Sequence, residues 1–139
     1  MRGRPWTLPL AACVALLAAC ATTRSKQNLL DDTLRAYASA VRWGDLAQAQ
    51  AFLDPKLREQ RAPSALDLAR FKQVRVTAYE EQPRTPVGDD EVSQVVEIGL
   101  VNVNTQTARS IVDRQLWRYD EKDKRWWLTS GLPDITHSQ

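Results

Sequence analysis

One predicted strand carries the residues best suited to chemistry. Arg109, Asp113, Gln115 and Trp117 occupy alternate positions and so share one face of a regular strand. A carboxyl in apolar surroundings has a raised pKa and can act as a general base, which makes Asp113, with Tyr37 on a helical stripe, a candidate catalytic pair. However, alternating Arg, Asp and Gln are more typical of the solvent face of a strand. On that interpretation Tyr37 is a core residue with its hydroxyl at the rim.

Other catalytic and cofactor chemistry finds little support in this chain. His137 is the single histidine, which excludes sites with two His ligands and leaves no interior imidazole base. The sequence has no Gly-rich phosphate loop, no Cys and His set with metal spacing and no Gly-x-Ser-x-Gly elbow. The acidic run Asp89, Asp90 and Glu91 lacks the alternating pattern of a Ca²⁺ loop and indicates a solvated turn. We therefore predict no metal site and no cofactor.

A basic start and an apolar run precede Cys20. After Arg2 and Arg4, residues 8–19 are almost entirely apolar and too few to span a bilayer. The run ends Leu17-Ala18-Ala19-Cys20, which resembles the lipobox of bacterial lipoproteins. This resemblance implies export, attachment of a diacylglycerol carrying fatty acids such as palmitate to the Cys20 sulfur, and cleavage before Cys20. An ordinary signal peptide cleaved near the same place is the alternative interpretation.

The residues around Cys20 also bear on location and charge. In lipoproteins of Gram-negative bacteria an Asp after the cysteine favours the inner membrane, so Ala21 implies the outer membrane, on its periplasmic side. Cys13 falls in the removed segment, which leaves no intramolecular disulfide. Without Arg2 and Arg4, the 19 Lys and Arg are reduced to the number of Asp and Glu, which is 17. A neutral mature chain offers no electrostatic footprint for nucleic acid.

The hydrophobic spacing predicts helices first. The polar residues 21–27 indicate a flexible tether, and a helix begins near Asn28 with one apolar stripe made of Leu30, Leu34, Tyr37 and Val41. Gly44 ends this helix. Asp45 caps a second one, which ends or bends at Asp54-Pro55. Ser64-x-x-Asp67 is a capping box for one or two further turns.

Strands follow, because the apolar period changes from 3.6 to 2. Residues 74–79 alternate with Val74, Val76 and Ala78 on one face, and residues 82–90 form a loop. The strand over 92–104 changes parity between Leu100 and Val101, which predicts a β-bulge beside Gly99. Residues 108–119 and 125–129 complete a bent antiparallel meander.

This order of elements resembles the nuclear-transport-factor-2-like (NTF2-like, cystatin-like) superfamily. The resemblance rests on Leu34-x-x-Tyr37-x-x-Ala40-x-x-Trp43-Gly44-Asp45 and on the ending Trp117-Arg118-Tyr119 with Arg125-Trp126-Trp127-Leu128. It implies an α+β domain of two to three N-terminal helices packed on a curved four-stranded antiparallel sheet. In this superfamily the helices and the sheet form a cone. The enzymes of the superfamily place acidic, basic or phenolic side chains inside that cone. The predicted organisation is a signal peptide over 1–19, a lipidated tether over 20–27, a single domain over 28–133 and a tail over 134–139.

The last hairpin concentrates aromatic residues. Trp126 and Trp127 are adjacent in a strand and must point to opposite faces. Leu128 shares the side of Trp126, so Trp126 is predicted inside and Trp127 on the outer face. There Trp127 is either covered by Arg118 and Arg125 or forms a contact surface with them, since aromatic and Arg residues are enriched at interfaces.

Together these observations predict an outer-membrane lipoprotein that displays a small, non-enzymatic binding module in the periplasm. It is held to the membrane by its lipid anchor. Its partner is either an envelope protein or a small apolar ligand in the cone. The alternative function is a small cofactor-free enzyme with Asp113 and Tyr37 in its pocket. The two functions differ in whether these side chains face a common cavity.

Overall fold

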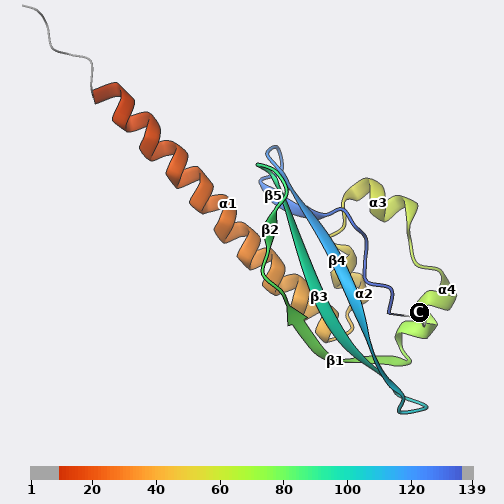
Figure 1. Cartoon of the computed structure of the whole chain (residues 1–139). Helices are drawn as coiled ribbons and strands as arrows, with labels where there is room; N and C mark the ends of the chain where they lie inside the picture. Colours follow the sequence, from red (N-terminus) through yellow and green to blue (C-terminus); the bar gives the residue numbers. More distant parts are fainter. Residues whose placement is uncertain (1–9, 136–139) are drawn as a thin grey trace, which may run out of the picture.

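The first helix, α1, is longer than its apolar stripe alone predicts. The computed structural model describes residues 10–135, and the side chains of residues 22–135 apart from Leu46. Helix α1 spans Leu10–Arg42, so residues 21–27 are helical rather than a flexible tether, and the helix does not begin near Asn28. The predicted stripe from Leu30 to Val41 is confirmed as buried. Figure 1 shows α1 crossing the sheet with its C-terminal part, while its N-terminal part projects beyond the domain.

Three short helices follow, each positioned by a local cap. Gly44 adopts a φ of 68° at the end of α1, and the Asp45 side chain accepts a hydrogen bond from the Gln48 amide at the start of α2 (Leu46–Gln50). Helix α3 (Pro55–Gln60) begins where the sequence indicated an end, because Asp54 caps it and proline is favoured in a first turn. The predicted capping box of Ser64 and Asp67 is confirmed at α4 (Ala65–Phe71).

The sheet is antiparallel, in the order β1-β3-β4-β5, with a two-residue strand β2 beside β3. Its strands are β1 (Val74–Glu81), β2 (Thr85–Pro86), β3 (Glu91–Asn102), β4 (Ala108–Asp120) and β5 (Arg125–Leu128). The long strands β3 and β4 pair without interruption from Glu91↔Arg118 to Val101↔Ala108. The predicted fold class, helices packed on a curved four-stranded antiparallel sheet, is confirmed.

A β-bulge does occur at the level of Gly99, but in the neighbouring strand. The pairing of β1 with β3 shifts between Val76 and Ala78, so that Thr77 is the extra residue. The prediction of a bulge within β3 is therefore wrong. The prediction that Tyr79 shares the outward face of Arg75 is also wrong. The extra residue of the bulge reverses the alternation of the strand, so that Tyr79 points into the core.

The core lies between α1 and the concave face of the sheet. Its largest fully buried side chains include Trp117, Tyr37, Ile98, Leu100 and Leu128. Ile135, which the sequence placed in a C-terminal tail, is a buried member of this core. Residues 136–139 of that predicted tail lie outside the described residues.

Candidate functional site

The inward face of β4 carries a buried polar cluster, the Asp113 cluster, formed by Asp113, Gln115, Trp117 and Tyr79. The Gln115 Nε2 donates to Asp113 Oδ2 at 2.8 Å and to the Tyr79 hydroxyl at 3.0 Å. The Trp117 Nε1 donates to Gln115 Oε1 at 3.0 Å. The grouping of these β4 residues on one face is confirmed. Their placement on the solvent face is wrong, because each polar group finds its partner inside the fold.

Tyr37 projects from α1 onto the same interior. Its ring packs edge-on against Trp117, with ring centroids 5.2 Å apart, and against Phe52. Its hydroxyl is buried and has no hydrogen-bond partner among the described residues, so it does not reach the rim. The Gln94 Oε1 is the other buried side-chain polar atom of the described residues without a partner, and no sequence pattern pointed to it.

Burial dominates the electrostatics of this interior. It raises the pKa of the Asp113 carboxyl, an effect that the hydrogen bond from Gln115 partly offsets. It also raises the pKa of the Tyr37 phenol, with a further contribution from the charge of Asp113. A carboxyl whose pKa is raised toward neutral pH is better suited to donate and accept protons in a catalytic step. Burial therefore moves the pKa of Asp113 in the direction that suits a general acid or base, but moves the pKa of Tyr37 further from neutral pH.

The condition of an accessible cavity is not met in the described part of the chain. Neither Asp113 nor Tyr37 lines any of its five principal cavities. The segment that ends at Ile135 packs against the core, and the Ile135 carbonyl accepts a 2.6 Å hydrogen bond from Arg109. Beneath Ile135 a cavity of only about 20 Å³ remains, room for about one water molecule. Asp113 and Tyr37 thus face a packed interior rather than a common cavity or water.

A larger cavity lies on the outside of the sheet, between α3 and the β4–β5 hairpin. This groove, the α3 groove, has a volume of about 630 Å³ and is lined by residues that include Lys56, Gln60, Arg118 and Trp127. Arg118 forms an ion pair with Asp54 at 2.9 Å. The guanidinium of Arg125 lies 3.9 Å from the ring centroid of Trp127. The groove therefore combines an aromatic floor with charges of both signs.

The predicted division of the two tryptophans is confirmed. Trp126 belongs to the core cluster, and Trp127 lies outside it. Trp127 is nevertheless only 8% exposed, because Arg125 and the groove residues cover it. Arg125 and the groove residues thus cover most of Trp127. The part of this predicted contact surface that a partner can reach is the rim of the groove.

Cys20 lies within the backbone of α1, but its side chain falls outside the described residues, as do residues 1–9 of the predicted signal peptide. In the described residues, no helix combines the length and apolar character needed to cross a bilayer. Among the same residues, no three or more His, Cys, Asp or Glu side chains come together in a way that could hold a metal ion. Lipidation of Cys20 stays a prediction.

Sequence comparisons do not assign the chain to a family. No protein-family model matches it, and no curated protein matches it. Solved structures do match, at low sequence identity. One is a ketosteroid isomerase-like protein from Erwinia carotovora atroseptica, with a TM-score of 0.51 and 16% identity over 73% of this chain and 89% of that one. Another is an NTF2-like protein with a cystatin-like fold from Novosphingobium aromaticivorans, with a TM-score of 0.46 and 14% identity over 91% and 88%.

The chain therefore has the NTF2-like, cystatin-like fold that the helix motif and the last hairpin predict. A likeness at this level of identity shows the fold alone, and one fold supports many chemistries. Function has to be argued from the site.

Proposed function

We propose that the chain is an outer-membrane lipoprotein, acylated on Cys20, whose NTF2-like domain binds a protein of the cell envelope from the periplasmic side. The lipobox and the basic, apolar leader support the anchor. Two or three acyl chains hold a protein at a membrane essentially permanently. The anchor would keep the domain near envelope proteins that lie at the same membrane.

One observation favours binding over catalysis: the interior is filled, whereas the α3 groove is open. Asp113 and Tyr37 line none of the principal cavities of the described residues, so a substrate would have to displace core side chains to reach them. The α3 groove already presents Lys56, Gln60 and Arg118 around Trp127. Aromatic and Arg residues in a groove are typical of the centre of a protein interface.

The anchor is tested by Cys20→Ser, with Cys13→Ser as the matched control. We expect Cys20→Ser to abolish incorporation of a labelled fatty acid and to block the lipoprotein-specific cleavage, while Cys13→Ser incorporates label normally. The measurement is metabolic labelling followed by separation of inner and outer membranes. A Cys20→Ser product that is still acylated and cleaved would contradict the anchor, and label confined to the inner membrane would contradict the location.

The groove is tested by reversing a charge at its rim. Lys56 lines the groove and Lys72 lies outside it, both exposed, so Lys56→Glu and Lys72→Glu form a matched pair. After cross-linking in intact cells, we expect Lys56→Glu to reduce recovery of a specific envelope partner several-fold and Lys72→Glu to leave it unchanged. Equal recovery with both variants would contradict binding at the groove.

A second candidate function rests on a specific observation: the buried Tyr37 hydroxyl has no partner among the described residues, and it shares the interior with Asp113, whose carboxyl pKa is raised by burial. On this alternative the interior opens to admit a small apolar ligand or substrate. Titration of the protein with small apolar molecules would then shift the backbone NMR signals of β4, and Asp113→Asn would alter those shifts. Shifts confined to α3 and β5 would instead favour the groove.

A further inference from the structure

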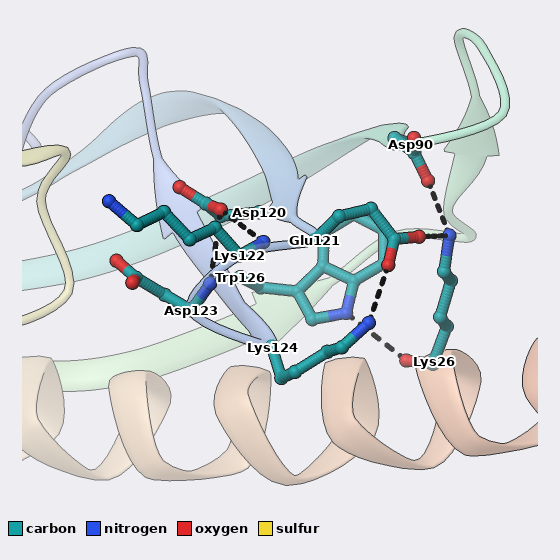
Figure 2. A network of polar contacts seen from close by, with 8 residues as sticks. All are labelled: Lys26, Asp90, Asp120, Glu121, Lys122, Asp123, Lys124 and Trp126. Atoms are coloured by element: carbon teal, nitrogen blue, oxygen red, sulfur yellow. Dashed lines mark hydrogen bonds and ion pairs between the residues drawn. The ribbon is translucent and has the colours of Figure 1, made fainter.

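The side chain of Lys26, on α1, contacts two loops of the sheet that are far apart in the sequence. Its Nζ lies 2.8 Å from Asp90 Oδ1, in the loop between β2 and β3, and also pairs with Glu121 in the β4–β5 turn. Glu121 in turn accepts from Lys124 Nζ at 2.8 Å. Figure 2 shows Asp90 and Glu121 meeting at the Lys26 ammonium, with Lys124 bound to Glu121. The ion pairs raise the pKa of Lys26 and lower that of Glu121.

Aromatic contacts fix the same residue from a second direction. The Lys26 Nζ lies 4.7 Å from the centroid of the Tyr119 ring. The Trp126 Nε1 donates to the Lys26 carbonyl at 3.1 Å. The loop at Asp90 is also tied to the end of β4, since the Tyr119 amide donates to the Asp90 carbonyl at 2.8 Å. We call these contacts the Lys26 clamp. They hold α1 to the sheet one turn before its first core residue, Leu30.

The clamp gives the predicted anchor a fixed direction. Helix α1 is continuous through Cys20 and Lys26, and six residues of α-helix rise about 9 Å. Figure 1 shows that α1 leaves the domain at the end where β2 and the β4–β5 turn lie. The β3–β4 turn around Asn104 lies at the opposite end of β3 and β4.

We propose that the Lys26 clamp orients the domain on a lipid surface, with the loop at Val87–Asp90 and the turn at Glu121–Lys124 facing the headgroups. This inference rests on acylation of Cys20, which puts the membrane about 9 Å beyond the clamp. The facing loops carry the acids Asp89, Asp90, Glu121 and Asp123 and the bases Lys122 and Lys124, and Asp90 is paired with Lys26. Such a surface lacks the cluster of Lys and Arg that selects anionic lipids and suits a zwitterionic headgroup layer.

The orientation is tested with the acylated protein in phosphatidylcholine vesicles. Acylation and cleavage leave no free thiol, so Val87→Cys and Asn104→Cys each give one labelling site at opposite ends of the domain. We expect energy transfer from a fluorophore at position 87 to acceptor lipids to exceed that from position 104 several-fold. Equal transfer from both sites, or greater transfer from position 104, would overturn the orientation.

The clamp is tested by Lys26→Met, with Arg35→Met as its matched control. Arg35 is also a cation on α1, but its partner Asp32 lies in the same helix and both are exposed. Lys26→Met is expected to reduce the difference in transfer between positions 87 and 104, whereas Arg35→Met leaves it unchanged. An unchanged difference in Lys26→Met would show that the clamp does not orient the domain.

Two further measurements separate this inference from the proposed function. Flotation with vesicles reports the anchor alone: protein that fails to float contradicts acylation and removes the basis of the orientation. Amide hydrogen exchange of residues 21–27, without vesicles, reports the clamp alone. We expect these amides to be protected in the wild type and in Arg35→Met, and to exchange several-fold faster in Lys26→Met. Wild-type amides as fast as those of an unfolded peptide would overturn the clamp even in a protein that floats.

Discussion

At the scale of single residues, the Tyr37 hydroxyl, like the Gln94 Oε1, is a destabilising group in the interior. It is buried and has no partner among the described residues, and a buried polar group left unpaired costs about 1–3 kcal/mol. The ring itself packs well against Trp117 and Phe52. The cost therefore belongs to one oxygen atom.

Tyr37→Phe is accordingly expected to leave the free energy of unfolding unchanged or to raise it by up to about 1–3 kcal/mol. Tyr79→Phe is the matched control, because the Tyr79 hydroxyl accepts a hydrogen bond from Gln115 and its loss should cost about 1 kcal/mol. Urea unfolding of both variants measures the difference. A Tyr37→Phe protein as destabilised as Tyr79→Phe would mean that the Tyr37 hydroxyl has a partner.

Asp113 predicts a pH dependence of stability. Its pKa is higher in the folded chain than the reference value of 3.8, chiefly through burial, so the folded state holds this proton more tightly than the unfolded state does. The contribution of Asp113 to the free energy of unfolding therefore falls as pH rises from 3.8 to the folded pKa, and is constant above it. Asp113→Asn removes this dependence.

We expect the stability of Asp113→Asn relative to wild type to increase across that pH window and then level off. Urea unfolding of both proteins at a series of pH values from the reference pKa upward is the measurement. A relative stability that stays constant over the whole series would show that Asp113 has the same pKa in the folded and unfolded chains.

At the scale of elements, the bulge in β1 depends on Gly99 in β3. A Cβ placed on Gly99 would lie 3.0 Å from both the Ala78 Cβ and the Thr77 Oγ1, and neither atom is at the end of a long flexible side chain. Gly99→Ala should therefore cost about 1–3 kcal/mol of stability through overpacking. Gly88→Ala is the control, since nothing lies within 4 Å of its added Cβ. Thermal unfolding compares the two, and equal midpoints would contradict this role of Gly99.

Elements set by local signals were predictable from the sequence. The stripe on α1 follows from the 3.6 period, and the caps at Asp45 and Ser64 involve side chains that bond within three residues. Helix α3 was missed because Asp54-Pro55 was interpreted as an end, although the same pair starts a helix equally well.

Features that depend on contacts between distant segments were not predictable. The bulge belongs to the pairing of two strands. The change in apolar alternation along residues 92–104 predicted it beside Gly99, but it occurs opposite Gly99, in the neighbouring strand β1. The β4 face of the candidate site was grouped correctly, yet its burial depends on partners such as Tyr79, which lies 36 residues from Gln115. The Lys26 clamp joins segments even further apart, and no local pattern marks it.

At the scale of the whole molecule, the end of the described chain completes the fold. Ile135 is buried as a member of the core, and its carbonyl accepts a hydrogen bond from Arg109 on β4. Ile135→Ala should cost about 2–5 kcal/mol, whereas Val112→Ala, at a side chain that is 55% exposed, should cost far less. Urea unfolding of the two variants is the test. A small effect of Ile135→Ala would show that the core is stable without this side chain.

The bond from Trp126 to Lys26 spans 100 residues, and this separation has a consequence for how the molecule is made. At ordinary rates of synthesis, the second partner emerges on the order of ten seconds after the first. Trp117, Trp126, Leu128 and Ile135, all core residues, are late arrivals as well. In the growing chain α1 can pack early against α2 and β1, but the part of its apolar stripe that contacts β5 stays exposed until this last strand appears. A chain arrested before β5 lacks these core residues and is expected to be cleared by proteolysis rather than to persist as a folded fragment.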